Sequence, residues 1–241
     1  MIFERYALAV LVFLSVTALG TAQSNTAELS VEESYLQQTV ENMIIRDQSR
    51  ASSREEKMIA LDYIEDAIGR GNNSEEVWGA LEYLTLEGIL NKTRENGRLT
   101  NNFPDVRMRA VVFLGELGTE EAKNTLIKLL IAESEPMVIT EAFRSLAKIG
   151  INNNGDASNA IAWVLNHFEA TMADDRMAFT ALEAFEELAE KSDKAANLTV
   201  ITTLSRIASA GHYNRNIRDR AREALEKIRL KAAASRLGTQ S

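Results

Sequence analysis

The sequence predicts an all-α protein, an α-solenoid in which helical hairpins stack side by side. The chain of 241 residues contains only two prolines and twelve glycines, and 45% of its residues are hydrophobic. This composition favours helices packed around a substantial core. In addition, one apolar pattern with helical spacing occurs four times, at intervals of 32, 39 and 40 residues.

Each copy of the pattern is anchored on an alanine, with one apolar residue four positions before it and two more four and seven positions after it. The anchors are Ala110, Ala142, Ala181 and Ala221. The preceding residues are Val106, Val138, Met177 and Ile217, and the following pairs are Leu114/Leu117, Leu146/Ile149, Phe185/Leu188 and Leu225/Ile228. A weaker copy starts at Ala60, with Ile64 and Ile68. This spacing predicts an amphipathic helix whose apolar stripe faces the core.

A turn signal and a second apolar helix follow the first helix in most copies. The second helices are expected in "EEVWGALEYLTLEG", "EEAKNTLIKLL", "ASNAIAWVLNHF" and "AANLTVITTLSRIA". Pro104 and Pro136 stand just before first helices, where a missing N–H costs nothing. A single helical hairpin cannot bury its apolar face, whereas a stack of hairpins forms a continuous core. We therefore expect an array of about five hairpins over residues 51–232.

The segment "PDVRMRAVVFLGELGTEEAKNTLIKLL" resembles HEAT repeats, which have Asp-x-Val-Arg, then Ala, then Leu-Gly, and Glu-Ala at the start of the second helix. The resemblance to this family, including its HEAT-like repeats of the PBS-lyase type, is strongest from Pro104 to Gly150 and continues to Ile228. It implies a right-handed superhelix that serves as a scaffold for another protein. The alternative that it implies is an enzyme or enzyme accessory of the lyase branch, which would need a chromophore-bearing client.

The N-terminal segment "MIFERYALAVLVFLSVTALGTAQS" has a short apolar run followed by small residues at Gly20 and Ala22. This pattern predicts a signal peptide over residues 1–22, cut after Ala22, and a mature protein without a membrane span. An uncleaved membrane anchor is the alternative. Cysteine is absent, which excludes a lipid-modified cysteine. We expect a periplasmic or secreted bacterial protein with a capping helix and link over residues 23–50 and a flexible tail over residues 233–241.

Catalytic and metal-binding patterns are missing from the sequence. The only histidines, His167 and His212, are not spaced as metal ligands, and no glycine-rich phosphate loop occurs. We therefore expect no enzyme activity, no metal and no cofactor. Asp105 and Arg107 are expected to form structural ion pairs between neighbouring repeats.

No nucleic-acid partner is expected, because the expected export places the chain in the wrong compartment and the chain outside its basic C-terminal end is strongly acidic. From Tyr213 onward, eight basic residues stand against three acidic ones, which gives +5 there and −13 in the remainder. The basic C-terminal helix is interpreted as a terminal cap with a polar outer face, with contact to a membrane surface as the alternative.

Two groups of residues are candidates for binding a partner. Alignment of Leu81, Leu126 and Ile161 as one core position places Tyr83, Lys128 and Trp163 at one equivalent position of three second helices. The lysine indicates a solvated position, where aromatic residues are typical of interfaces. The alternative is that the two aromatic residues pack between repeats.

The second candidate group lies in the long segment from Gly88 to Asp105, which has a turn signal at Asn96-Gly97. Its basic residues Lys92, Arg94 and Arg98 make this loop locally positive. Long loops in compact arrays are functional or disordered, and the sequence leaves both possibilities open.

Overall fold

A computed structural model describes residues 30–169 and 173–238 of the chain. The predicted signal peptide lies outside these residues. The chain divides into two compact units, Met1–Thr39 and Val40–Ser241. The described part of the first unit is the N-terminal half of helix α2 (Val31–Ser49). A reciprocal capping box starts this helix, because the Ser30 N–H donates to Glu33 Oε2 and the Glu33 N–H donates to Ser30 Oγ.

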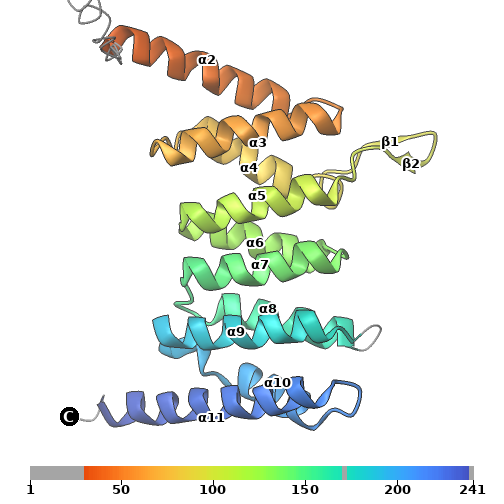
Figure 1. Cartoon of the computed structure of the whole chain (residues 1–241), viewed down its shortest axis with the longest axis vertical. Helices are drawn as coiled ribbons and strands as arrows, with labels where there is room; N and C mark the ends of the chain where they lie inside the picture. Colours follow the sequence, from red (N-terminus) through yellow and green to blue (C-terminus); the bar gives the residue numbers. More distant parts are fainter. Residues whose placement is uncertain (1–29, 170–172, 239–241) are drawn as a thin grey trace, which may run out of the picture. The chain divides into compact units, whose positions relative to one another are not determined.

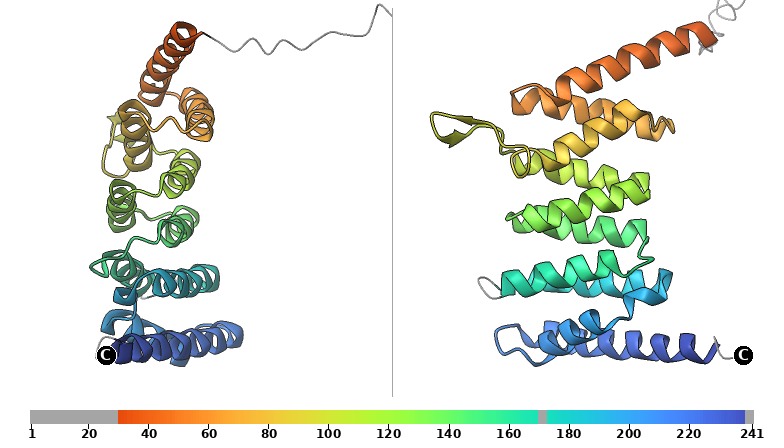
Figure 2. Two further views of the ribbon diagram at one scale, coloured as in Figure 1. Left: turned by 90° about the vertical axis from the view of Figure 1, so that its left-hand side faces the viewer. Right: turned by 180° about the vertical axis from the view of Figure 1, so that it is seen from behind.

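The second unit consists of helical hairpins in two layers, as Figures 1 and 2 show. The first helices of the hairpins are α3 (Arg54–Gly69), α5 (Pro104–Leu117), α7 (Pro136–Ile149) and α9 (Asp175–Lys191). The second helices are α4 (Glu75–Leu86), α6 (Glu120–Ala132), α8 (Asp156–Glu169) and α10 (Leu198–Ser209), and a short 3₁₀ helix, η1 (Asp193–Ala195), precedes α10. First helices pack on first helices and second helices on second helices, so the predicted all-α solenoid is confirmed.

Proline and glycine residues set the boundaries of two first helices. Pro104 and Pro136 occupy the first turn of α5 and α7. Gly118 and Gly150 end the same helices in the left-handed conformation, with φ of 65° and 71°, a geometry that glycine adopts without strain. These two helices therefore begin and end where the repeat predicts.

The core is built from the predicted stripe. All four anchor alanines are completely buried, as are Leu114, Leu146, Phe185 and Leu188. Gly115 allows α5 and α7 to approach each other closely, because a Cβ atom at this position would lie 2.8 Å from Ser145 Oγ. Ser145 Oγ donates a hydrogen bond to the Val111 carbonyl across the same contact, at 2.9 Å. Small residues in the first helices thus set the spacing of the layer.

The C-terminal end of the array differs from the expectation. The described residues form four hairpins, and the fifth unit consists of one long helix, α11 (Arg215–Gly238), packed on α9 and α10. The predicted flexible tail is helical as far as Gly238, while residues 239–241 lie outside the described residues. Residues 229–237 contain no glycine, proline or asparagine and include three consecutive alanines, so nothing stops the helix earlier.

The long segment between α4 and α5 contains a β-hairpin that protrudes beside the array (Figure 1). Strand β1 (Arg94–Glu95) pairs antiparallel with β2 (Arg98–Leu99). Asn96 and Gly97 form its two-residue turn with φ of 49° and 81°. Positive φ at both positions is what a type I′ turn requires, and Asn-Gly is its preferred sequence. The turn signal is confirmed, but the strands on either side of it were not predicted.

Candidate functional site

The exposed side of the second helices contains the first group of predicted partner-binding residues. Leu81, Leu126 and Ile161 are completely buried, which confirms that they share one core position in α4, α6 and α8. Tyr83, Lys128 and Trp163 each follow one of these core residues by two positions, on the side of the helix that faces away from the core. The same register in α10 places Arg206 two residues after the buried Leu204. The sequence "TLSRIA" has the same spacing of a core leucine and a residue two positions later, but Arg206 was not among the predicted residues.

Trp163 is the most exposed aromatic residue of this row, with 48% of its surface accessible. Its indole stacks on the imidazole of His167, one helical turn later in α8, with ring centres 5.4 Å apart and planes only 3° from parallel. His167 in turn meets Phe168 edge-on at 5.9 Å. The stack holds the indole in place, so about half of a flat aromatic side chain remains exposed to solvent.

Tyr83 and Lys128 have different surroundings from Trp163. The Lys128 ammonium forms an exposed ion pair with Glu82 at 3.1 Å, which links α6 to α4. Tyr83 is half-buried against the core, and its ring lies 5.4 Å from Lys57 Nζ and 5.9 Å from the Arg50 guanidinium. Burial, followed by the charge of Glu87, raises the pKa of the Tyr83 hydroxyl. Tyr83 is therefore half-buried beside α3 of its own hairpin and the end of α2, whereas Trp163 is half exposed to solvent.

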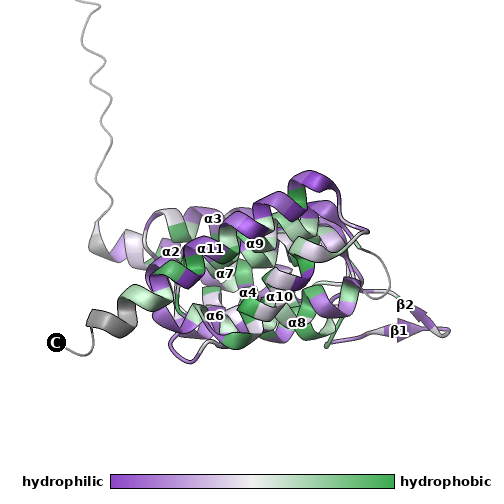
Figure 3. Cartoon of the chain, turned by 90° about the horizontal axis from the view of Figure 1, so that it is seen from below, coloured by the Kyte–Doolittle hydropathy of each residue, from purple (hydrophilic) through white to green (hydrophobic). Residues whose placement is uncertain are grey.

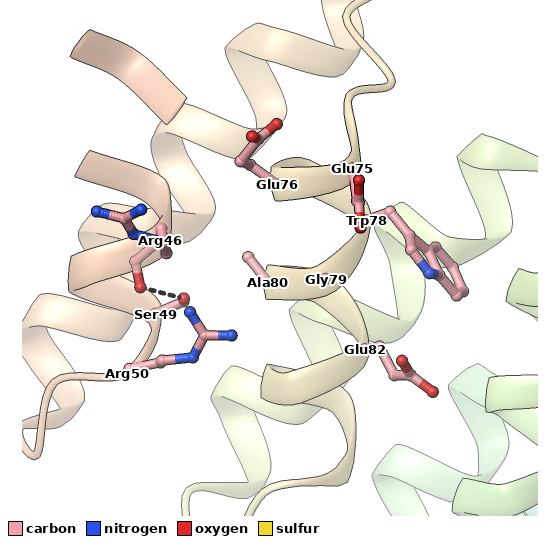
Figure 4. Close-up of a pocket in the computed structure, with 9 residues that line it drawn as sticks. All are labelled: Arg46, Ser49, Arg50, Glu75, Glu76, Trp78, Gly79, Ala80 and Glu82. Carbon is pink, nitrogen blue, oxygen red and sulfur yellow. Dashed lines mark hydrogen bonds between the residues drawn. The ribbon is translucent and has the colours of Figure 1, made fainter. Parts of the chain in front are cut away.

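A cleft of about 500 Å³ lies between the end of α2 and α4 (Figure 4). Arg46 and Arg50 line one side of it, and Glu75, Glu76 and Glu82 line the other. Figure 4 shows Arg50 reaching toward α4, while Trp78 points away from α2. The cleft thus presents opposite charges on its two walls, and Gly79 and Ala80 of α4 form a floor with little side-chain bulk.

A buried charged network adjoins this cleft at Ser49, and Arg107 is its only member for which the sequence predicted a structural ion pair. Lys57 is fully buried and pairs with Glu87 at 2.9 Å, while its ammonium also donates to the Ser49 carbonyl at 3.0 Å. Arg107 is 1% exposed and holds Glu133 through two hydrogen bonds, of 2.7 and 3.2 Å. Arg107 also donates to the Glu87 carbonyl, so the two ion pairs join the end of α2, α3, α4, α5 and the end of α6.

The β-hairpin is attached to the same network. Asn101 is 6% exposed, and its amide clamps the two legs of the hairpin together: Oδ1 accepts from the Thr93 N–H at 2.8 Å and Nδ2 donates to the Asn91 carbonyl at 2.7 Å. Arg107 Nη1 donates to Asn102 Oδ1 at 2.8 Å. Gly88 is required at the base, since a Cβ atom there would lie 2.5 Å from the Asn101 carbonyl oxygen. The hairpin therefore has a fixed base.

The predicted basic residues of this segment, Lys92, Arg94 and Arg98, are all exposed on the hairpin. Figure 3 shows both strands in the hydrophilic colour, projecting beyond the helices. The structure thus places the two predicted groups on different elements, Trp163 in the middle of α8 and the basic residues on β1, β2 and the residue leading into them.

The residues without a predicted binding role lie in ion pairs or hydrogen bonds. Asp105 accepts a hydrogen bond from Arg54 Nε at 2.7 Å, which confirms an ion pair between neighbouring repeats. Arg107 reaches the preceding repeat through the Glu87 carbonyl and does not pair with Asp105. His212 Nε2 lies 2.8 Å from Glu169 Oε1, so this histidine connects the start of the α11 segment to α8.

Metal clusters and membrane-spanning helices are not found in residues 30–169 and 173–238. In this part of the chain no group of three or more histidine, aspartate or glutamate side chains is arranged to hold a metal ion. None of the described helices is both long enough and apolar enough to cross a bilayer.

Comparison with known proteins gives one family match. No curated protein matches the sequence. Among solved structures, a de novo designed 16-helix transmembrane nanopore, determined by cryo-EM, is 17% identical, with a TM-score of 0.27. The alignment covers 86% of this chain and 64% of the designed chain. A family model described as HEAT repeats matches residues 97–178, from the turn of the β-hairpin to the start of α9. Residues 97–178 of this protein are therefore a HEAT-repeat domain.

Proposed function

We propose that this protein is a non-catalytic, exported bacterial scaffold that binds another protein, as part of an envelope or appendage assembly, through the surface around Trp163. HEAT-repeat domains generally serve as scaffolds for protein interactions, and residues 97–178 include the α8 helix that carries Trp163. The observation that carries the proposal is the exposed indole held by His167. Folding alone gives little reason to leave a large aromatic ring in water, whereas a partner that covers it gains its full burial.

Replacement of Trp163 by alanine tests this proposal. An aromatic anchor of an interface contributes about 2 kcal/mol or more, so Trp163→Ala should weaken partner capture about thirtyfold. The measurement is the concentration of immobilised protein needed to capture the partner from a native envelope extract. The melting temperature of the variant should stay close to that of the wild type, because the indole makes few core contacts.

Phe179→Ala is the matched control, because Phe179 is a 41% exposed aromatic residue on α9, in the other helix layer. It should leave capture unchanged. If Trp163→Ala instead lowers the melting temperature by several degrees and binds normally once folded, Trp163 belongs to the core and the interface lies elsewhere. Equal losses of capture in both variants would also contradict an interface centred on Trp163.

A further inference from the structure

Four cations at one end of the second unit lack an acidic partner. In the described stretch of residues 30–169, every lysine and arginine lies within 4 Å of a carboxylate oxygen except Arg50, Lys92, Arg94 and Arg98. The last three lie on the β-hairpin, and Arg50 follows the end of α2. In a chain with a net charge of −8, these four residues form a local concentration of positive charge.

The same buried carboxylate connects Arg50 and the hairpin. Arg50 lies over the ring of Tyr83, whose hydroxyl is 3.5 Å from Glu87 Oε1. The hairpin reaches the same oxygen atom through Asn101 Nδ2, at 3.4 Å. Lys57 forms an ion pair with Glu87. One network therefore positions both the base of the hairpin and Arg50. The basic end, defined as Arg50, Lys92, Arg94 and Arg98, is therefore preorganised.

The pairing register leaves one edge of the hairpin open. Thr100 N–H donates to the Thr93 carbonyl at 3.0 Å, and Glu95 faces Arg98 across the turn. Antiparallel pairing alternates along a strand, so the N–H and C=O of Arg94, between Thr93 and Glu95, point away from β2. Lys92 lies two residues earlier, outside β1 but next to Thr93, whose carbonyl still pairs with Thr100, so alternation along this leg places its side chain on the same face as that of Arg94. Both residues are exposed. This edge of the hairpin therefore presents the backbone N–H and C=O of Arg94 next to two positively charged side chains.

We propose that the β1 edge of this hairpin binds an extended acidic polypeptide segment, which adds to the sheet as a third strand. Carboxylates at alternate residues of an extended segment are about 7 Å apart, which is also the spacing of Lys92 and Arg94 along an extended leg of the hairpin. Cross-strand pairs of opposite charge then fix the register, while the backbone of Arg94 supplies the main-chain hydrogen bonds. Arg98 and Arg50 add long-range attraction, which speeds encounter with an anionic partner.

A polypeptide fits the hairpin better than other anions. Four cations are few for a nucleic acid, and the acidic remainder of the chain repels a polyanion that extends beyond them. A lipid headgroup offers no chain to pair with the open strand edge. This inference rests on the proposed function as a protein-binding scaffold, but it uses a surface distinct from that of Trp163, so either one can fail alone.

The test uses a fluorescein-labelled dodecapeptide of alternating glutamate and threonine, with a glutamine–threonine peptide as the neutral comparison. Fluorescence anisotropy should show about tenfold tighter binding of the acidic peptide to the full chain, lost at high salt. The double variant Arg94→Glu/Arg98→Glu should weaken this binding at least about tenfold. Hydrogen exchange should slow at the Arg94 amide when the acidic peptide binds, because that N–H gains an acceptor.

The matched control is Lys194→Glu/Arg229→Glu, which changes the net charge equally at two exposed residues that form no ion pair among the described residues. It should keep peptide affinity within about twofold of the wild type, since screening confines the effect to nearby charges. Equal weakening in both double variants overturns the proposal, because binding then follows net charge alone. So does an Arg94 amide without protection, or hairpin-dependent binding to phosphatidylglycerol vesicles in the absence of peptide binding.

Discussion

Arg107 is the residue on which the buried network depends. Its guanidinium bonds Glu133, the Glu87 carbonyl and Asn102 while being almost fully buried. Removing one partner of a buried ion pair leaves the other charge without compensation, so Arg107→Ala should lower the free energy of unfolding by about 3–5 kcal/mol. Urea denaturation followed by circular dichroism measures this loss.

Arg109, two residues later, provides the comparison for Arg107. It bonds Asp62 at 2.6 Å and Glu65 at 2.5 Å, but both carboxylates are largely exposed. Arg109→Ala should therefore cost at most about 1 kcal/mol. Similar losses in the two variants would mean that burial of the Arg107 pair contributes nothing to its strength.

Sequence patterns identify buried apolar residues better than buried charged ones. The anchor alanines and their stripe were predictable because helical periodicity repeats within one segment. Lys57 and Glu87 lie in different helical segments, and nothing local marks either residue as buried. Tyr83 shows the same limit: its position matches that of Trp163, but the neighbouring Lys57 and Arg50 exist only in the first hairpin and its surroundings.

The attachment of α11 to α9 should depend on pH. Glu186 accepts from Arg220 at 2.8 Å and lies 3.5 Å from Lys227, and its side chain is 12% exposed. Burial opposes its ionisation, but the hydrogen bond and charge of Arg220, followed by those of Lys227, outweigh burial and hold the pKa of Glu186 below its ordinary value of about 4.5. A lowered pKa means that this stabilisation is present above about pH 4.5 and is lost as the pH falls through the folded-state value.

Glu186→Gln should therefore lower the free energy of unfolding by about 1 kcal/mol at pH 7, and the difference from wild type should shrink below pH 4.5. Urea denaturation at a series of pH values provides the measurement. Glu223→Gln is the control, since Glu223 lies 4.0 Å from Arg220 and is 72% exposed. A difference between Glu186→Gln and wild type that stays constant from pH 7 to pH 3 would assign the loss to packing instead of charge.

Element boundaries were predictable where the sequence contains a residue that fixes the backbone. Proline before α5 and α7 and glycine after them marked both helices correctly. The strands β1 and β2 were missed because two residues are too short for an alternating pattern, although Asn96-Gly97 marked their turn. The end of α11 was missed because an alanine-rich polar segment reads equally as a tail or as a helix.

At the scale of the whole molecule, the proposed export predicts a defined mature N-terminus. The apolar run of residues 6–20 and the small residues Gly20 and Ala22 precede a polar segment, which is the pattern of a cleaved signal. Mass spectrometry of the protein from its native host should find Gln23 as the first residue. A chain that begins at Met1 or Ile2 would contradict cleavage and favour a retained anchor.

The β-hairpin is attached to the buried network, and it is also an insertion into a periodic framework. Three residues, Glu133–Glu135, suffice to connect α6 to α7, whereas residues 87–103 connect α4 to α5, although these two helices pack directly on each other. Lengthening a link by this amount costs only about 1.5 kcal/mol of loop-closure entropy, so helix packing and not link length sets the period. A repeat framework can gain such a segment without being rebuilt. The hairpin is therefore expected to tolerate changes of length and sequence that the packed helices would not.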